Sequence, residues 1–485
     1  MTVPTSTIAA IATGGAPGGI GVVRVSGPDA LSAGRAVARG LPAAPTPRHA
    51  YVTAFEDAAG RALDEGLALY FAAPKSFTGE DVVELHAHGA PRLLSLLLEG
   101  VLRHPGVRLA EPGEFTRRAF LNGRIDLARA EAVADLVSAE SEAQVRAAAA
   151  QLTGELSRRL AALREPLVAL HADLEGVLDF PDEAEGADAD VAARLAASRR
   201  AVEALVADGR AGALVRRGAR VVLYGPVNAG KSTLFNRLVG AARALVDPEP
   251  GTTRDVLEAR VELGGLAVTL VDTAGLREQP GRLEALGIER AREALRGADV
   301  ALLVIPPEAK PDEVEAWRRE APEGVRVELW GKADLRPIGS SDEPPSPRES
   351  GAMGADVPGL AEARRAVENG GPGGGPSTSG RGVSEHPMAV SGHTGEGVAA
   401  LKAELIRRLG GGVDAGVRLT SERHLDALRR AAEALERAQL AVTASTLEVV
   451  SGEVGLALSA LAEITGEDVS AELLDAIFAR FCIGK

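Results

Sequence analysis

The sequence predicts three parts: a small α+β domain, an all-α helical domain and an α/β domain inserted into the helical one. Residues 1–124 mix short alternating runs such as GIGVVRVSG and VVELHAHG with glycine and proline, the pattern of strands joined by turns. Apolar residues recur at helical spacing in residues 125–214 and again in 411–485. Between them, residues 215–410 alternate strand-like and helical segments, which is typical of an α/β unit.

The first helical stretch shows its buried face most clearly in a row of leucines. Their spacing of three and four residues predicts an amphipathic helix, and the members are Leu156, Leu160, Leu163, Leu167 and Leu170. Pro181, in DFPDE, predicts a turn after this helix. An insertion is structurally acceptable because the ends of a domain often lie close together. Inside the inserted part, residues 337–387 are low in complexity and predict a disordered surface loop.

Composition limits the functions that the chain can have. The formal net charge is -14, which argues against wide, non-specific phosphate binding, so any RNA contact must be local or shared with a partner. A single cysteine, Cys482, excludes an intramolecular disulfide and favours a reducing compartment. The sequence has neither a basic, apolar leader nor a run near the ~18 apolar residues of a spanning helix. We therefore expect a cytoplasmic protein that is neither exported nor membrane-spanning.

The motif GPVNAGKS, from Gly225 to Ser232, follows a predicted strand and precedes a predicted helix. It matches the phosphate-binding P-loop pattern GxxxxGK[ST], in which backbone N–H groups surround the phosphates. Lys231 is expected to reach the β- and γ-phosphates, and the Ser232 hydroxyl to ligate Mg²⁺. The nucleotide contacts expected here are Asn228, Ala229, Gly230, Lys231, Ser232 and Thr233.

Two further segments follow in the order of the two switches of a Ras-like GTPase. GTTRD offers the Thr253 hydroxyl to Mg²⁺, and DTAG places Asp272 near the magnesium and the Gly275 N–H near the γ-phosphate. Together with the P-loop, this order predicts a GTPase. The contacts expected around the switches are Asp247, Pro248, Glu249, Pro250, Gly251, Thr252, Thr253, Asp272, Thr273, Ala274 and Gly275.

Guanine specificity is expected from GKAD, residues 331–334, and SGHTGEG, residues 391–397. Asp334 can accept two hydrogen bonds from the ring N–H and exocyclic amine of guanine, which adenine does not offer in that arrangement. Lys332, Ser391 and Gly392 complete the expected contacts. The usual pattern is NKxD, so Gly331 in place of asparagine predicts weaker nucleotide affinity with guanine preference retained.

The hydrolytic residues are less evident. Leu276 occupies the place of the glutamine that orients the attacking water in Ras-like GTPases, so another group must act. Glu284 could orient the water, although taken alone it reads as an ordinary glutamate on a helix surface. Asn228 could bind a monovalent cation, a potassium ion in place of an arginine finger, with Asp247, Glu249 and Thr252 as further ligands. Lys231 and Asp272 complete the expected catalytic set.

Segments outside the nucleotide motifs resemble the MnmE (TrmE) family of tRNA modification GTPases along nearly the whole chain. They include SFTGEDVVELHAHG, PGEFTRRAFLNGRIDLARAEAVADL and LSALAEITGEDVSAELLDAIFARFCIGK. The resemblance implies the roles of Glu284 and Asn228 given above. It also implies a homodimer whose G domains associate in potassium and GTP, and a complex, a heterotetramer or larger, with the FAD-dependent MnmG. This complex would add a carboxymethylaminomethyl or aminomethyl group at carbon 5 of the wobble uridine of certain tRNAs.

The resemblance further implies that the N-terminal α+β domain mediates dimerisation and binds 5-formyltetrahydrofolate or a related one-carbon folate. Contacts carry over to Arg24, Glu84 and Arg124, with Lys485 close by. Cys482 is either a small buried residue or a thiol near this site, acting as nucleophile or acid. His86 and His88 share a strand face but lack a third metal ligand at suitable spacing.

Two other functions stay open at this stage. A ribosome-assembly GTPase shares this kind of G domain but carries a KH-type RNA-binding module instead of this N-terminal domain. A nucleotide-gated scaffold that only positions MnmG is the second, and hydrolysis in potassium against sodium separates it from an enzyme.

Overall fold

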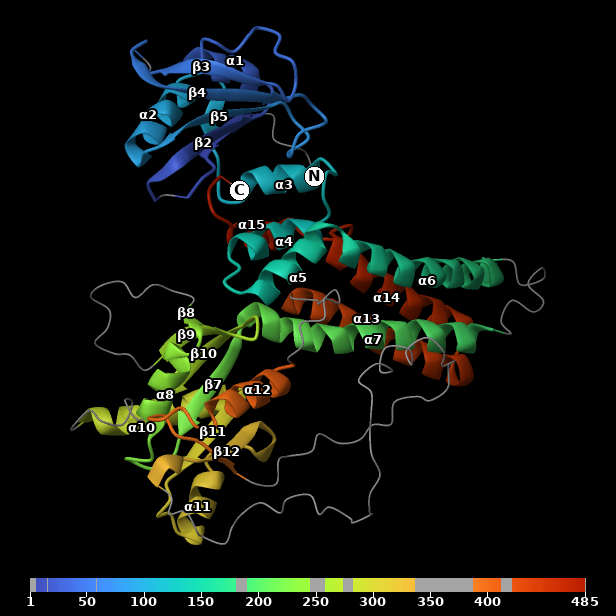
Figure 1. Ribbon diagram of the computed structural model, residues 1–485. Helices are drawn as coiled ribbons and strands as arrows, with labels where there is room; N and C mark the ends of the chain where they lie inside the picture. The colour runs from blue at the N-terminus through green and yellow to red at the C-terminus, as the bar shows by residue number, and fades with distance from the viewer. Residues whose placement is uncertain are drawn as a thin grey trace, which may run out of the picture. The chain divides into compact units, whose positions relative to one another are not determined.

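The computed structural model describes residues 6–14, 16–57, 59–179, 190–244, 258–273, 282–335, 387–410 and 421–484, with only the backbone for 210–211, 243–244 and 282–288. Two compact units emerge (Figure 1). The first comprises Met1–Gly218, Gly264–Ala267 and Gly412–Lys485, and the second Ala219–Leu263 and Val268–Gly411. Pro181 and the segment 337–386 lie outside the described residues.

The first unit begins with a six-stranded sheet in the order β3-β4-β5-β2-β1-β6. All neighbouring pairs are antiparallel except β1 with β6. Helices α1 and α2 bury their apolar faces on one side of the sheet around Val23, Phe55 and Leu85 (Figure 1). The strands are β1 (Thr7–Ile11), β2 (Gly18–Ser26), β3 (Ala50–Glu56), β4 (Ala62–Phe71), β5 (Val82–Gly89) and β6 (Val107–Leu109), and the helices α1 (Ala30–Val37) and α2 (Pro91–Leu102).

Helices from both ends of the chain make up the rest of this unit. The predicted leucine row is confirmed: Leu156, Leu160, Leu167 and Leu170 are fully buried in one core with α7, α13 and α14. Pro166 lies within α6 without ending it. The helices are α3 (Glu114–Leu121), α4 (Leu127–Val137), α5 (Glu142–Leu152), α6 (Glu155–Asp179), α7 (Val191–Arg217), α13 (Glu422–Ala444), α14 (Leu447–Thr465) and α15 (Ala471–Phe478).

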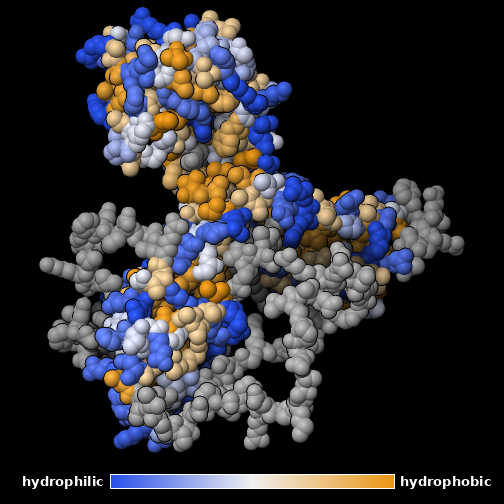
Figure 2. Space-filling view, in the orientation of Figure 1, coloured by the Kyte–Doolittle hydropathy of each residue, from blue (hydrophilic) through white to orange (hydrophobic). Residues whose placement is uncertain are grey.

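A smaller apolar cluster ties α3 and α4 to the C-terminal helix α15. It contains Leu127, Leu474, Phe478 and Phe481. Apolar atoms gather in this region, as Figure 2 shows for the part that Figure 1 labels α3 and α15. The C-terminal segment is thereby held against the start of α3: the N–H of Gly113, the residue before this helix, donates to the carbonyl of Cys482 at 3.4 Å.

The second unit is an α/β domain whose sheet has the strand order β13-β12-β11-β7-β10-β9-β8. The strands from β13 to β10 run parallel, and β8 pairs antiparallel with β9. They are β7 (Ala219–Tyr224), β8 (Arg243–Ala244), β9 (Glu258–Leu263), β10 (Leu266–Asp272), β11 (Val300–Ile305), β12 (Arg326–Trp330) and β13 (Met388–Ala389). The helices are α8 (Lys231–Gly240), α10 (Arg282–Arg296), α11 (Pro311–Arg318), α12 (Val398–Arg408) and the short 3₁₀ turns η2 (Glu323–Val325) and η3 (Ala333–Leu335).

The central strands explain where a ligand can bind. β7 and β11 are almost entirely buried apolar residues, as expected for parallel strands covered on both faces. Ligands of such sheets bind at the carboxyl ends of the strands, where the chain order reverses. Here the order reverses at β7, which lies between β10 and β11. None of the helices in the described part of the chain has the length and apolar character needed to cross a membrane.

Candidate functional site

The P-loop connects the carboxyl end of β7 to the first turn of α8. Gly225 has φ 135°, and a methyl group there would lie 2.5 Å from the carbonyl oxygen of Val304 on β11. Gly230, which precedes α8, has φ 97°. Only glycine adopts such a conformation without strain, so these two residues allow the loop to curl and aim N–H groups at an anion. The amino end of α8 adds its positive partial charge at the same point.

Lys231 is the first residue of α8 and is 5% exposed. Its Nζ donates hydrogen bonds to the carbonyls of Gly225 at 3.1 Å and Pro226 at 2.6 Å. The ammonium group is thus held across the loop by the loop itself. A nucleotide phosphate that enters the loop meets a positive charge already in place.

Ser232 and Asp272 bring the P-loop and the end of β10 together. The Ser232 Oγ donates to Asp272 Oδ2 at 2.6 Å. Mg²⁺ prefers oxygen ligands and usually takes only a few from protein, with the remainder from water and phosphate. A hydroxyl and a carboxylate side by side fit that requirement. Thr273 has a different role, since its Oγ1 donates to the carbonyl of Leu223 at 2.9 Å and is buried.

Asn228 lies at the tip of the P-loop with φ 62° and is exposed. Asparagine tolerates this left-handed conformation better than most residues. The side chain therefore stands at the edge of the phosphate site rather than in the interior of the domain.

The two loops expected to bind guanine, here called the guanine loops (residues 331–335 and 390–393), line a cavity of about 210 Å³ beside the P-loop. Asp334 and Ser391 line it, and a hydrogen bond from the Ser391 side chain is the main reason that the pKa of Asp334 is lowered, with His393 and Lys332 adding to the effect. The carboxylate is therefore ionised at neutral pH and can accept hydrogen bonds. The residues around the cavity are Gly230, Thr233, Leu234, Val304, Gly331, Lys332, Asp334, Leu335, Val390, Ser391, Gly392 and His393.

Several expected nucleotide residues lie outside the described part of the chain. Glu284 belongs to α10, of which only the backbone is described at that position. The other expected nucleotide contacts outside it are Asp247, Pro248, Glu249, Pro250, Gly251, Thr252, Thr253, Ala274 and Gly275. Leu276 and the expected folate contact Lys485 also lie outside the described residues.

In the N-terminal sheet, Arg24 on β2 and Glu84 on β5 are cross-strand partners. The Arg24 Nε donates to Glu84 Oε1 at 2.9 Å, and Glu84 Oε2 lies 3.2 Å from His86 Nε2. The His86 contact is the main cause that lowers the pKa of Glu84; burial opposes it, and Arg24 reinforces it. The guanidinium also lies 5.7 Å from the ring centroids of Phe77 and Phe115.

Arg124, the third expected residue, joins this group through the loop before β5. Its Nε donates to the carbonyl of Ser76 at 3.2 Å, directly before Phe77. The structure therefore places Arg24 and Arg124 against one loop, residues 76–80, with Glu84 paired to Arg24.

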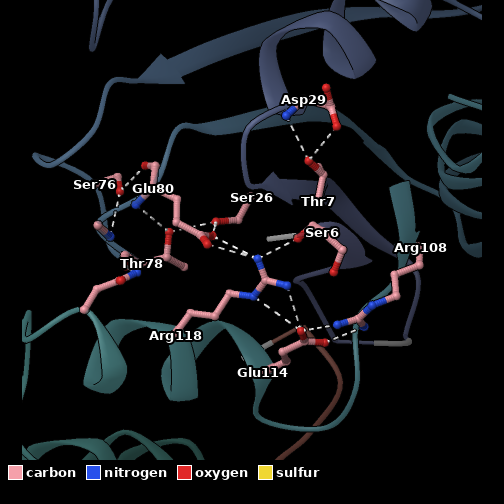
Figure 3. Close-up of polar contacts among 12 residues, drawn as sticks. Ser6, Thr7, Ser26, Asp29, Ser76, Thr78, Glu80, Arg108, Glu114 and Arg118 are labelled. Carbon is pink, nitrogen blue, oxygen red and sulfur yellow. Dashed lines mark hydrogen bonds and ion pairs between the residues drawn. The ribbon is translucent and has the colours of Figure 1, made fainter. Parts of the chain in front are cut away.

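The same loop is anchored by a residue that sequence reasoning missed, the fully buried Arg118 on α3 (Figure 3). Its Nη1 donates to Glu80 Oε1 at 3.0 Å and its Nη2 to Glu114 Oε1 at 2.9 Å. Glu80 in turn accepts from the Ser26 hydroxyl at 2.7 Å. Arg118 lies in PGEFTRRAF, a segment that carries the family resemblance. Nothing in this segment alone shows which of its two arginines is buried.

Cys482 is exposed, so it is not the small buried residue that was one of its two interpretations. His88 contacts Asp64 on β4, with 2.8 Å between His88 Nδ1 and Asp64 Oδ1. In the chain segments that the structure describes, no group of three or more His, Cys, Asp or Glu side chains is arranged to hold a metal.

The largely parallel sheet, the P-loop before α8, the Ser232–Asp272 pair and the cavity beside Asp334 define a P-loop nucleotide hydrolase of the GTPase class. Comparison with known proteins gives the family. Residues 7–124 match the family described as "GTP-binding protein TrmE N-terminus", and residues 127–482 match "MnmE helical domain".

Relatives extend this similarity over the full chain. The "tRNA modification GTPase MnmE" of Myxococcus xanthus (strain DK1622) is 60% identical, and the alignment covers 100% of both chains. The protein of the same name from Thiobacillus denitrificans (strain ATCC 25259 / T1) is 43% identical over 99% of this chain and 98% of its own. The chain therefore belongs to the MnmE (TrmE) family and is a GTP-hydrolysing enzyme.

Proposed function

We propose that this GTPase uses potassium-dependent GTP hydrolysis to drive the modification of carbon 5 of the wobble uridine of certain tRNAs, together with MnmG. The observation that carries the proposal is that a complete P-loop lies in the same chain as both family-specific domains. The relatives that match along their whole length are named for tRNA modification. The group added is a carboxymethylaminomethyl or aminomethyl group.

We assign phosphate binding to the P-loop backbone and Lys231. Ser232, Asp272 and Thr253 are the side chains proposed to hold Mg²⁺, which supplies positive charge next to the β- and γ-phosphates when bound. The 2.6 Å contact between Ser232 and Asp272 supports this part, because it brings two suitable oxygens together. The Lys231 ammonium group, held by the carbonyls of Gly225 and Pro226, would neutralise charge on the β- and γ-phosphates.

Asn228 is the proposed potassium ligand, with Asp247, Glu249 and Thr252. Its exposure at the rim of the loop supports this, since an amide oxygen there can face a cation beside the phosphates. When bound, the cation supplies the charge that an arginine finger supplies in other GTPases.

Glu284 is proposed to orient the attacking water. It lies in the first turn of α10, the helix that follows the second switch in the chain. A carboxylate can accept a hydrogen bond from water directly or through a second water. This role suits a chain that has Leu276 where Ras-like proteins have glutamine.

The N-terminal domain is proposed to bind 5-formyltetrahydrofolate or a related one-carbon folate at the loop 76–80. Glu84, kept ionised by His86 and Arg24, can accept a pair of hydrogen bonds from the amino-pyrimidine edge of the pterin. Arg24 orients Glu84 and retains donors for an anionic tail, while Arg124 and Lys485 add positive charge. Cys482, whose thiol is proposed to act near this site, is exposed and follows the helix α15 that packs on α3.

A homodimer through the N-terminal domains is supported by the face of the sheet opposite α1 and α2. Val52 and Leu67 are cross-strand partners that are 69% and 38% exposed. The same row of the sheet continues to His86, next to the proposed folate site. An apolar pair this exposed is well suited to face a second copy of the chain.

The test is mass spectrometry of wobble nucleosides from cells that lack the protein, complemented with wild type or with Glu284→Ala. We expect the carbon-5 modification to disappear without the protein, to return with wild type and to stay low with the variant. Modification restored fully by Glu284→Ala would favour the scaffold function. A normal nucleoside profile in the deleted cells, with a ribosome-assembly defect instead, would favour the other alternative.

A further inference from the structure

The first of the two guanine loops lies directly against the backbone of the P-loop. A methyl group on Gly331 would lie 2.5 Å from the carbonyl oxygen of Ala229 and 2.8 Å from Val304 Cγ1. The loop cannot easily back away, because the N–H of Gly331 donates to the carbonyl of Ile305 at 2.8 Å and the N–H of Ala333 to that of Val390 at 3.1 Å. No side chain fits at position 331 in this arrangement.

The second loop makes the same kind of contact with α8. A methyl group on Gly392 would lie 2.7 Å from both the backbone nitrogen of Leu234 and the carbonyl carbon of Thr233. The atoms that this methyl group would meet belong to the rigid backbone of the helix and not to the flexible end of a side chain. Glycine at position 392 therefore has the same steric reason as glycine at position 331.

Lys332 lies between these contacts and shows what the close approach achieves. It has φ 53°, and its Cγ lies 3.7 Å from the point where a side chain on Gly230 would begin. Its aliphatic stem therefore covers the P-loop glycine, and Asp334 follows two residues later at the rim of the base cavity.

We propose that Gly331 and Gly392 are positioning residues that set the guanine pocket by docking both base loops, backbone to backbone, onto the P-loop and α8. In a GTPase with NKxD, the asparagine side chain braces the base and the P-loop. In this chain, direct backbone contact of the two guanine loops with the P-loop and α8 takes the place of that side chain. The consequence is opposite to the one expected from sequence: restoring asparagine at position 331 weakens guanine binding in this chain. The inference rests on the proposed contact between Asp334 and guanine.

The experiment measures the dissociation constants of fluorescent GDP and IDP for the full-length chain and for Gly331→Asn, Gly331→Ala and Gly392→Ala. Overpacking against backbone should weaken GDP binding by about tenfold or more in each variant. IDP lacks the exocyclic amine that Asp334 recognises, so displacement of Asp334 should cost GDP more than IDP, and their affinity ratio should fall. Gly324→Ala is the matched control, because a methyl group there meets nothing within 4 Å.

Thermal unfolding of each variant shows whether the domain is still folded, and Gly331→Ala is the mildest change if asparagine prevents folding. Gly331→Asn that binds GDP as tightly as wild type, or more tightly, overturns the inference. So does an equal loss for GDP and IDP, since general destabilisation lowers both together. A wild-type chain that does not prefer GDP over IDP would instead refute the contact of Asp334 with guanine.

Discussion

At the scale of single residues, the side chains of the phosphate site differ in their contacts within the fold. Lys231 is buried and donates hydrogen bonds to two loop carbonyls, and the Ser232 hydroxyl donates one to Asp272. Asn228 is exposed at the tip of the same loop. A change at Asn228 should therefore affect catalysis without disturbing the loop that holds the phosphates.

Asn228→Ala is expected to abolish the stimulation of GTP hydrolysis by potassium and to leave GDP affinity largely intact. The reason is that backbone N–H groups and Lys231 hold the phosphates. Single-turnover rates in potassium and in sodium measure the effect. The neighbouring Val227→Ala, at a residue 71% exposed, is the matched control and should retain stimulation. A mutant that keeps the wild-type rate in potassium would remove Asn228 from the cation site.

Arg24 joins three parts of the N-terminal site through Glu84, Phe77 and Phe115. Arg24→Ala is expected to weaken 5-formyltetrahydrofolate binding by several-fold or more, because a charged hydrogen bond contributes about 1.5 to 3 kcal/mol. Isothermal titration calorimetry gives the affinity. Arg92→Ala changes an exposed surface ion pair on α2 and should bind as wild type does. Equal affinities for both variants would place the folate pocket elsewhere.

The sequence predicts the nucleotide site in more detail than it predicts the site in the N-terminal domain. Gly225 to Ser232 could be found because strand, loop and helix are contiguous and each residue has a fixed physical task. The N-terminal group could not be found by spacing, since Arg24, Glu84 and Arg124 meet only after strands β2 and β5 pair. Arg118, which holds the loop between them, gave no separate signal because burial of an arginine depends on tertiary structure alone.

At the scale of elements, the helical domain is linked across its two sequence halves by a buried charged group. Glu131 on α4 accepts from Arg423 Nε at 3.0 Å and lies 2.6 Å from His424 Nε2 at the start of α13. Burial raises the pKa of Glu131, but His424 and Arg423 outweigh it and lower the pKa to about 2. The ionised carboxylate thus stabilises the fold wherever it is also ionised in the unfolded chain.

Glu131→Gln is expected to lower the free energy of unfolding of the helical domain by about 3 kcal/mol at pH 7, because it removes the buried carboxylate that accepts from the half-buried Arg423 and contacts His424. The folded pKa is depressed, so this contribution is complete above the unfolded pKa near 4.3 and is lost as pH falls toward 2. Urea titrations followed by far-ultraviolet circular dichroism at pH 7 and pH 3 measure the difference.

The matched control for that experiment is Glu436→Gln, on α13, the helix that carries the Arg423 and His424 partners of Glu131. Glu436 pairs with Arg199 at 3.2 Å but is 53% exposed, so its loss should cost less than about 1 kcal/mol. A difference between wild type and Glu131→Gln that stays constant from pH 7 to pH 3 would contradict the assigned role of the carboxylate.

Helices could be predicted where the apolar residues recurred regularly and only one face of the helix met solvent. The leucine row on α6 is such a case, and it was confirmed. Periodicity did not show which helices pack together: α6 and α7 share one core with α13 and α14, more than 200 residues later in the chain. That pairing follows from the insertion of an α/β unit between them.

At the scale of the whole molecule, the chain enters the α/β unit after α7 and leaves it before α13, and the short turn Gly264–Ala267 between these points belongs to the first unit. The entry leads from α7 through Gly218 to β7, and the exit follows Gly411 toward α13. Each unit has its own core, and we expect the α/β unit to move as a rigid body while its internal contacts persist. The proposed cation-dependent hydrolysis requires both switches to be ordered, and we expect contact with a second G domain to order them.

We therefore expect GTP to close the two G domains of a dimer on each other. A spin label at Arg319→Cys on the exposed end of α11, in a Cys482→Ser background, reports the distance between the two protomers by pulsed EPR. GDP-aluminium fluoride with potassium should shorten that distance relative to the apo and GDP states. A label at Leu440→Cys on α13, at a residue 66% exposed, should show no change because it belongs to the helical domain. Closure fails for this protein if the Arg319→Cys label gives one distance distribution in all three states, since the switches would then be ordered within a single G domain.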